Sequence, residues 1–511
     1  MEAVIGGELI AEWLIGSVWS GVTFAGCRRR MHKTVLNQLC ASLLLVASLT
    51  DAEGAAENSR ASLRLTPCTL PQLNRPARCG SLEVPENPGR PRDRHIAIAI
   101  AVIPAAVGPA LPDPITVLMG GPGEDAISAA AIYAEQFAPL LRDRDLLLVD
   151  QRGTGRSNAL NCDLFAGEDP SAALRDLFPP RAADRCARQL RARADLGQYT
   201  FAQFANDLEH VRRSLGYGPL NLLAGSYGTR AAQVYLRTYP ESVRTAHLAS
   251  VLPIDVPPPM TMAKTVQSAL EDVFVACADD TACRAAFPNL RDEFRDVIAR
   301  LDARAARAAV PGVVRAVPLD RGRVVEWFRS QLYRPGTAAA LPWLIHQAYE
   351  GDWQPIADGI LTSARGLRAA LSVGVFFSVT CSEDIAFMHE ADIERETRGT
   401  FLGDYRVRQQ QAACEHWPRA VLPEGYRAPV QSSVPTLFVS GDTDGASPLW
   451  FTQRVARGFE NRAEIVLRGR GHTEWSDCLG KVYEQFVRSG TVRALDASSC
   501  RAVPRPPFKT K

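Results

Sequence analysis

The sequence predicts an α/β fold, with a mostly parallel central sheet, helices on both faces and an inserted helical cap. Short apolar segments alternate with helical patterns between residues 94 and 249, and this alternation is typical of a parallel sheet. Residues 260–370 show helical patterns without a clear strand. Strand patterns return at 435–440 and 464–467, so we expect the cap to interrupt a single sheet.

Length and composition are those of an ordinary globular protein. The 511 residues are 46% hydrophobic and 22% charged, which suits one large domain with an insertion or two domains. The net charge is +2, with Lys and Arg spread along the chain. This balance offers no bulk attraction for nucleic acid or for a membrane surface, and it favours a small substrate.

The N-terminal segment has the pattern of a secretory signal. From Met31 the sequence reads Met-His-Lys, then a mostly apolar segment at 36–49 and small residues at 52–56. The apolar segment is short for a bilayer span. We therefore expect a cleaved signal and a periplasmic or secreted mature chain without stable membrane insertion. Residues 1–30 are then either upstream sequence or part of a long signal, and the alternative is an N-terminal membrane anchor.

Cysteine usage also indicates export. Two of the twelve cysteines, Cys27 and Cys40, lie in the leading segment. The other ten form neighbouring pairs along the chain and predict five local disulfides, as expected in an oxidising compartment. The C-x-x-C pairs and histidine spacing of a zinc site are lacking in the sequence, so we expect no metal. The pairs are Cys68 and Cys79, Cys162 and Cys186, Cys277 and Cys283, Cys381 and Cys414, and Cys478 and Cys500.

Three strands are expected in the first part of the core. Residues 94–102 form an entering strand, and residues 115–119 form a buried strand that ends in Gly-Gly-Pro-Gly at 120–123, a loop with exposed backbone N–H groups. Residues 146–150 form the next strand and open into a second glycine-containing loop. Asn158 stands there in place of the third glycine of a dinucleotide-binding fingerprint, so we expect no cofactor.

A helix and a sharp turn follow. Residues 199–215 show helical periodicity behind a capping-box pattern of Thr200 and Gln203. Residues 220–223 are a buried strand that runs into Ala-Gly-Ser-Tyr-Gly at 224–228, where a further helix begins.

The turn around Ser226 has the form of a nucleophile elbow. In such a turn the serine hydroxyl projects from the sheet, and the following backbone N–H points at the group that the serine attacks. Small residues are favoured two positions before and after the serine because strand and helix approach closely; Gly228 fits, whereas Ala224 adds one methyl group. The alternative is an ordinary Gly/Ser-rich turn between a strand and a helix.

The change to helical patterns after a proline-rich stretch marks the start of the cap. The chain then divides into an N-terminal extension with a signal peptide at 1–55, a core at 65–255 and 425–500, a helical cap at 256–424, and a tail at 501–511.

Partners for Ser226 are expected at the ends of later strands. A serine hydroxyl needs a histidine to accept its proton and a carboxylate to orient that histidine. Asp444 follows the strand at 435–440, and His472 lies in a glycine-rich loop after the strand at 464–467. The chain order Ser, Asp, His is typical of α/β-hydrolases. Asp442 is the rival acid, with the alternative role of binding the backbone of its own turn.

Five motifs together resemble the proline iminopeptidase branch of the α/β-hydrolases, especially its secreted tripeptidyl-aminopeptidase-like members with a TAP-like C-terminal part. The resemblance covers roughly residues 65–500 and implies hydrolysis of an amide or ester through an acyl-enzyme. It also implies a cysteine pair after the catalytic histidine, here Cys478 and Cys500. The motifs are Gly-Gly-Pro-Gly at 120–123, Asp-Gln-Arg-Gly-x-Gly-x-Ser at 150–157, the elbow at 224–228, Gly-Asp-x-Asp at 441–444 and Gly-His at 471–472.

Chemistry and resemblance assign the same catalytic roles. Ser226 attacks the substrate, His472 transfers the proton and Asp444 orients His472. The oxyanion is expected to be bound by the backbone N–H groups of Tyr227 and Gly121.

Three functional classes are compared. We expect a serine peptidase that cleaves short peptides near the N-terminus; the alternatives are a carboxylesterase for small or lipid esters and a non-catalytic binding protein, which should lack a triad member. An aminopeptidase needs a carboxylate for the substrate's α-ammonium group, because an unpaired charge in a closed pocket is costly. Glu383, with Asp384 as second choice, is expected to supply it at the end of the cap.

Overall fold

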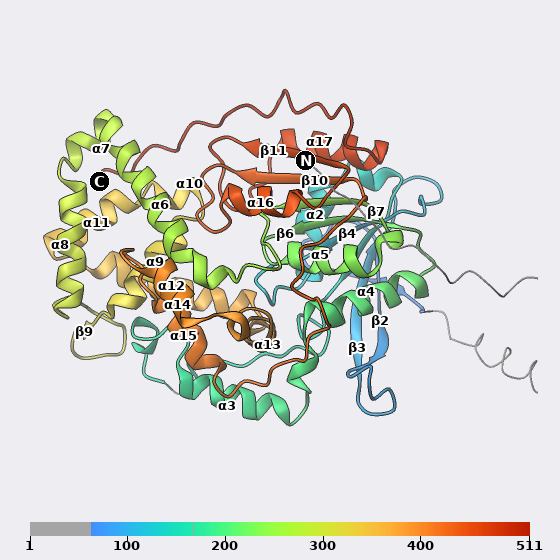
Figure 1. Ribbon diagram of the computed structural model, residues 1–511, viewed down its shortest axis with the longest axis horizontal. Helices are drawn as coiled ribbons and strands as arrows, with labels where there is room; N and C mark the ends of the chain where they lie inside the picture. The colour runs from blue at the N-terminus through green and yellow to red at the C-terminus, as the bar shows by residue number, and fades with distance from the viewer. Residues whose placement is uncertain (1–62, 167) are drawn as a thin grey trace, which may run out of the picture. The chain divides into compact units, whose positions relative to one another are not determined.

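The computed structural model describes residues 63–166 and 168–511, and every structural statement below concerns these residues (Figure 1). The predicted signal peptide, Met31, Cys27 and Cys40 therefore lie outside the described residues.

A nine-stranded sheet forms the centre of the fold, in the order β1-β2-β3-β5-β4-β6-β7-β10-β11. The pairs from β5 to β11 are parallel, and β1, β2 and β3 join one edge in antiparallel pairs. The predicted mostly parallel sheet is confirmed. The strands are β1 (Thr66–Cys68), β2 (Ala77–Pro85), β3 (His95–Ile103), β4 (Ile115–Leu118), β5 (Leu146–Val149), β6 (Leu220–Gly225), β7 (Val243–Ala249), β10 (Thr436–Gly441) and β11 (Arg462–Leu467).

Helices cover both faces of this sheet. Successive side chains of a strand point to opposite faces, so Leu222 and Ala224 join one apolar cluster while Leu223 joins another. The first cluster includes residues of α4, α5 and α16, and the second includes residues of α2 and α17. The helices of this part are α2 (Ala130–Gln136), α3 (Pro180–Arg191), α4 (Phe201–Ser214), α5 (Gly228–Thr238), α16 (Leu449–Ala456) and α17 (Asp477–Ser489), with short 3-10 helices at Ile127–Ala129, Leu140–Arg142, Ala172–Leu174, Leu196–Gln198 and Pro240–Ser242.

The N-terminus of α4 is capped by Thr200, as the sequence predicts. The Thr200 side chain accepts a hydrogen bond from the backbone N–H of Gln203 at 3.3 Å, as an N-cap residue should. The Gln203 side chain contacts Gln198 instead of returning to Thr200, so only one half of the expected capping box forms.

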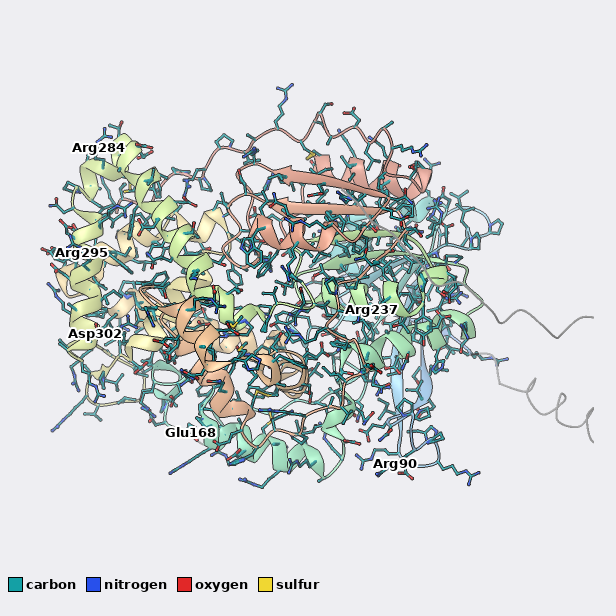
Figure 2. The ribbon with its side chains drawn as sticks, in the orientation of Figure 1. Arg90, Glu168, Arg237, Arg284, Arg295 and Asp302 are labelled. Atoms are coloured by element: carbon teal, nitrogen blue, oxygen red, sulfur yellow. A yellow bond between two sulfur atoms is a disulfide. The ribbon has the colours of Figure 1, made fainter. Side chains whose placement is uncertain are left out.

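The segment between β7 and β10 is mainly helical and gathers on one side of the sheet (Figure 1). Helices α6, α8, α9, α11 and α12 share an apolar cluster of their own, and Figure 2 shows Arg284, Arg295 and Asp302 at its outer surface. The helices are α6 (Pro258–Asp279), α7 (Thr281–Ala286), α8 (Leu290–Asp302), α9 (Arg321–Gln331), α10 (Pro335–Ala338), α11 (Leu341–Glu350), α12 (Gln354–Ala370), α13 (Val373–Glu383), α14 (Glu390–Thr397) and α15 (Tyr405–Cys414), with a 3-10 helix at Ile385–Phe387.

Two features of this segment differ from the predicted cap. A two-stranded antiparallel ribbon, β8 (Arg307–Ala308) with β9 (Val317–Pro318), interrupts the helices, so the prediction of helical structure throughout 260–370 is wrong at that point. In addition, α13 and Trp417 pack in the apolar cluster of the sheet, not in that of the other cap helices. The domain limits at 256 and 424 stay a prediction.

The C-terminal tail connects sheet and cap. Val503 donates its backbone N–H to Arg468 O just after β11, at 3.0 Å. Further along, Lys509 donates to Ala339 O at 3.1 Å and Phe508 packs against the cap cluster. In the described part of the chain, no helix has the length and apolar character needed to cross a bilayer.

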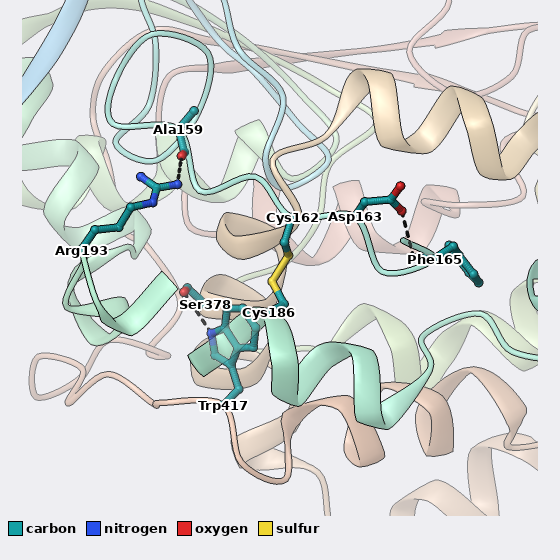
Figure 3. Close-up of a disulfide and its surroundings, with 8 residues drawn as sticks. All are labelled: Ala159, Cys162, Asp163, Phe165, Cys186, Arg193, Ser378 and Trp417. Atoms are coloured by element: carbon teal, nitrogen blue, oxygen red, sulfur yellow. Dashed lines mark hydrogen bonds between the residues drawn. A yellow bond between two sulfur atoms is a disulfide. The ribbon is translucent and has the colours of Figure 1, made fainter. Parts of the chain in front are cut away.

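Five disulfides join the ten described cysteines in the predicted neighbouring pairs. Figure 3 shows the Cys162–Cys186 bond, which links the loop after β5 to α3. Close by, the Trp417 indole N–H donates to Ser378 Oγ at 3.1 Å. The disulfide and this buried hydrogen bond fix α3 and α13 beside the core.

The disulfide pattern predicts the thiol content of the mature protein. Denatured but unreduced protein that lacks residues 1–55 should show no free thiol, because every remaining cysteine is paired. Thiol titration followed by peptide mapping without reduction measures both the count and the partners. A stoichiometric free thiol, or a link between Cys68 and a cysteine other than Cys79, would contradict the pairing.

Candidate active site

Ser226 occupies a strained turn between β6 and α5. Its φ is +53°, a left-handed conformation that non-glycine residues rarely adopt and that often occurs at functional sites. Its backbone N–H donates to Ala249 O at 3.1 Å, and its carbonyl oxygen accepts from Thr229 Oγ1 at 2.6 Å. These bonds from neighbouring elements hold the turn in place.

The two small-residue positions of the elbow differ in how strictly they are required. A Cβ atom at Gly228 would lie 2.0 Å from Leu118 O, so no larger residue fits without moving the backbone of β4. Ala224 is fully buried in β6 between Leu118 and Leu248, and its methyl group is accommodated there. The departure from glycine at this position therefore leaves the turn intact.

His472 and Asp444 form a buried hydrogen-bonded pair. Asp444 Oδ2 lies 2.9 Å from His472 Nδ1 and accepts a hydrogen bond from Ser447 Oγ at 2.6 Å. Burial disfavours the charged carboxylate, but the charge and hydrogen bond of His472 and the bonds from Ser447 outweigh burial and lower the pKa of Asp444. Asp444 therefore stays ionised and can orient the imidazole ring.

Asp442 has a different environment. Its Oδ1 accepts the backbone N–H of Gly469 at 2.7 Å, and its Oδ2 lies 3.7 Å from the Arg468 guanidinium. This carboxylate binds the neighbouring turn, whereas Asp444 contacts the histidine.

Ser226 and His472 line the same cavity, of about 380 Å³. The prediction that Ser226, Asp444 and His472 form one hydrogen-bonded set is only half fulfilled, because within the described residues no hydrogen bond joins Ser226 to His472. Such bonds are often long before substrate binds and shorten in the complex. The fold thus brings the serine and the histidine to one cavity.

Backbone N–H groups also lie beside Ser226. A Cβ atom at Gly120 would lie 3.2 Å from Ser226 Cβ and 3.6 Å from the Tyr227 nitrogen, so this glycine loop is packed against the elbow. Gly121 follows with φ of +103°. Neither the N–H of Tyr227 nor that of Gly121 donates to an acceptor within the described part of the chain. Both are available to a ligand atom.

Glu383 and Asp384 do not face this cavity, and the prediction that they bind a substrate is contradicted by their burial. Glu383 is 1% exposed and accepts hydrogen bonds from Tyr426 Oη and from the backbone N–H of Phe201. Burial raises the pKa of Glu383 to about 7 in spite of these two bonds. Its carboxyl group therefore belongs to the protein interior.

Asp384 is fully buried and paired with Arg230. Asp384 Oδ1 accepts from Arg230 Nη1 at 2.6 Å, and Oδ2 accepts from Tyr227 Oη at 3.0 Å. Burial and the nearby Asp384 charge hold the pKa of Tyr227 well above its usual value, so Tyr227 donates as a neutral hydroxyl. The sequence alone showed two acids at the end of the cap, but not the buried arginine that neutralises one of them.

Three residues that the sequence analysis did not single out belong to the site. Ser447 holds Asp444, the backbone O of Tyr333 accepts the N–H of His472 at 2.7 Å, and the Glu124 side chain lines the cavity. Glu124 stands directly after Gly-Gly-Pro-Gly, and this position in the sequence could have identified it as a site residue. Tyr333 lies in the cap after α9, so only the folded structure could reveal it.

Two further cavities adjoin the site. One, of about 310 Å³, shares Glu124 and Tyr333 with the Ser226 cavity and has mostly apolar walls, including Phe178 and Phe376. A larger one, of about 760 Å³, lies on the other side of Asp444 between α6 and the α16 end, and its lining includes neither Ser226 nor His472. We therefore associate the chemistry with the two smaller cavities. In the described part of the chain, no group of three or more His, Cys, Asp and Glu side chains is arranged to hold a metal ion.

The chain is similar to two protein families and to several known proteins. Residues 113–275 match the family model described as "alpha/beta hydrolase fold", and residues 399–500 match that described as "TAP-like protein". The chain is 24% identical over 494 residues to the tripeptidyl aminopeptidase of Streptomyces lividans, covering 89% of this chain and 90% of that protein. It is 28% identical over 274 residues to serine protease Hip1 of Mycobacterium tuberculosis, covering 47% of this chain and 51% of that protein. A solved proline iminopeptidase from Mycobacterium smegmatis aligns with a TM-score of 0.36 at 15% identity, over 80% of this chain and 98% of that chain.

Replacement of Asp384 by Ala should destabilise the fold. The substitution leaves the buried Arg230 guanidinium without its counter-charge, which costs about 3–5 kcal/mol. Urea unfolding gives the free energy, and Asp392→Ala, which removes a more exposed ion pair with Arg395, is the matched control with an expected cost within about 1 kcal/mol. Unchanged stability of the Asp384 variant, with a selective loss of activity on peptides that have a free N-terminus, would restore the substrate-binding interpretation.

Proposed function

We propose that this chain, a serine hydrolase of the α/β-hydrolase family with a TAP-like C-terminal region, is an exported aminopeptidase. It would release short fragments from the N-terminus of peptides through an acyl-enzyme. The observation that carries the proposal is the strained Ser226 elbow, which opens into the cavity that His472 also lines while Asp444 binds His472. The similarity to a tripeptidyl aminopeptidase over most of both chains supports the choice of a peptide substrate.

The proposed reaction uses the side chains in the following roles. His472 accepts the proton of Ser226 Oγ as that oxygen attacks the scissile carbonyl carbon, and Asp444 stabilises the imidazolium. The N–H groups of Tyr227 and Gly121 bind the oxyanion. His472 then gives the proton to the departing amine as the C–N bond breaks, and water releases the acyl fragment from Ser226 by the same proton transfers in reverse.

Export is proposed from two features. The signal-like segment after Met31 predicts secretion, and five local disulfides suit an oxidising compartment. With a net charge of only +2, the chain gives no electrostatic reason to propose a nucleic-acid partner.

Substitutions should show whether Asp444 or Asp442 is the acid of the proposed triad. We expect Ser226→Ala to lower kcat on the order of 10⁶-fold and Asp444→Asn by roughly 10⁴-fold, with folding preserved. Asp442→Asn is the matched control and should cause a far smaller loss, because Asp442 binds the Gly469 turn. Steady-state kinetics and circular dichroism on all three variants provide the test. A larger loss for Asp442→Asn than for Asp444→Asn would show that the wrong acid was chosen.

Substrate comparison should distinguish an aminopeptidase from an esterase. Purified mature protein should hydrolyse aminoacyl to tripeptidyl anilides with a free N-terminus at higher kcat/KM than the same compounds after N-acetylation. The measurement includes p-nitrophenyl butyrate as a neutral ester. Rapid ester hydrolysis without any cleavage of the anilides would favour the carboxylesterase alternative, and no Ser226-dependent hydrolysis at all would favour a binding protein.

A further inference from the structure

We propose that Glu124 binds the α-ammonium group of the peptide substrate and that the apolar cavity beside it receives the side chain of the N-terminal residue. The inference rests on the proposed aminopeptidase function and identifies how the enzyme would select a free N-terminus. It predicts short peptides with an unblocked, apolar first residue as the substrate class.

Glu124 is placed close to the nucleophile by a shared glycine. The backbone N–H of Glu124 donates to Gly120 O at 3.3 Å. On its other side Gly120 is packed against the elbow, because a Cβ atom there would lie 3.2 Å from Ser226 Cβ. Glu124 and Ser226 thus line one cavity, with the glycine loop between them.

Glu124 is only partly compensated by the protein. The half-buried side chain forms no ion pair within the residues that the structure describes. Burial raises its pKa more than the Gly120 N–H and the His472 and Arg334 charges lower it. Arg334 is exposed and lines the same cavity, but it forms no ion pair with Glu124. An ammonium group in the cavity would supply the missing counter-charge, as buried or partly buried charges require.

Two other carboxylates line these cavities, and their positions or partners differ from those of Glu124. Glu474 also lines the Ser226 cavity and, like Glu124, accepts one backbone N–H, from Gly471 at 2.8 Å, but it does not line the second cavity. Glu326 in the second cavity is buried and paired with Arg329 and Arg406, both at 2.7 Å. Among the described residues, Glu124 is therefore the carboxylate that lines both cavities without an ion pair.

The second cavity gives the N-terminal residue a place for its side chain. Glu124 and Tyr333 line both cavities, so an ammonium group bound at Glu124 sits where the two meet. The walls beyond are mostly apolar and include Leu177, Phe178 and Phe376. Three arginines also line this cavity, and each is bound within the protein, Arg329 and Arg406 by Glu326 and Arg323 by the Ala173 carbonyl. Substrate pockets commonly combine apolar walls with a few placed polar groups. The peptide would extend from this junction toward Ser226.

Replacement of Glu124 by Gln tests the assignment. We expect kcat/KM to fall on the order of 100-fold for a leucine-initiated tripeptidyl anilide with a free N-terminus, because the ammonium loses its charged partner. Activity on the N-acetylated anilide and on p-nitrophenyl butyrate should fall by a much smaller factor, since neither carries an ammonium group to lose. Glu124→Asp should keep part of the preference for the free amine. Asp125→Asn is the matched control: it removes a neighbouring charge that lines neither cavity, while an asparagine oxygen can still accept from the Ser128 N–H.

The outcomes separate this inference from the proposed function. Equal losses on all three compounds would indicate damage to the glycine loop and would overturn the role of Glu124. A wild-type preference for the free N-terminus that persists in Glu124→Gln would also overturn it, while the aminopeptidase function would stand. A wild-type enzyme that does not distinguish free from acetylated substrate would overturn both. Thermal unfolding of each variant identifies any loss that arises from misfolding.

Discussion

The buried ion pair between Arg230 and Asp384 is the constraint on which the rest of the site depends. Arg230 belongs to α5, the helix that starts at the elbow, and Asp384 follows α13 on the cap side. The same guanidinium donates to the carbonyl oxygens of Pro253 and Val256, where the chain leaves the sheet for the cap. A buried pair of this kind is tolerated only when its donors and acceptors are satisfied. One side chain therefore fixes the elbow helix, the exit into the cap and the return from it.

This fixed frame allows the elbow to keep a strained conformation. A positive φ at a serine is unfavourable by on the order of 1–3 kcal/mol and persists only where the surroundings determine it. For Ser226 the surroundings are the central strands, since β6 lies between β4 and β7, and the Thr229 hydroxyl, which binds the Ser226 carbonyl. The close approach of Gly228 to Leu118 leaves no room for a different path of the chain. Strain at the nucleophile is thus a consequence of packing in the middle of the sheet.

Features encoded by local pattern could be predicted from the sequence, and features that depend on distant packing could not. The parallel strands and the helix capped by Thr200 follow from apolar periodicity and turn residues, and the contact of His472 with Asp444 follows from their positions at strand ends. The β8–β9 ribbon has two residues in each strand, too few to show alternation. The sequence favours a substrate-binding role for Glu383 and Asp384 because it does not show their buried partners, Tyr426 and Arg230, which are remote along the chain. An aminopeptidase needs a carboxylate for the α-ammonium group of its substrate. Which acid is free to serve depends on which acids the fold pairs with other residues.

The cap contributes to the site through Tyr333, which contacts His472 and lines two cavities. Tyr333 accepts the backbone N–H of His472, and its ring lies 5.2 Å from the imidazole. The same residue forms a wall of both cavities that meet at Glu124. Its ring in turn contacts Arg329, whose guanidinium is held by Glu326 in the cap interior. Since proton transfer requires a correctly placed imidazole and selection requires correctly shaped walls, the packing of α9 bears on both turnover and specificity. The cap is in this sense part of the catalytic structure.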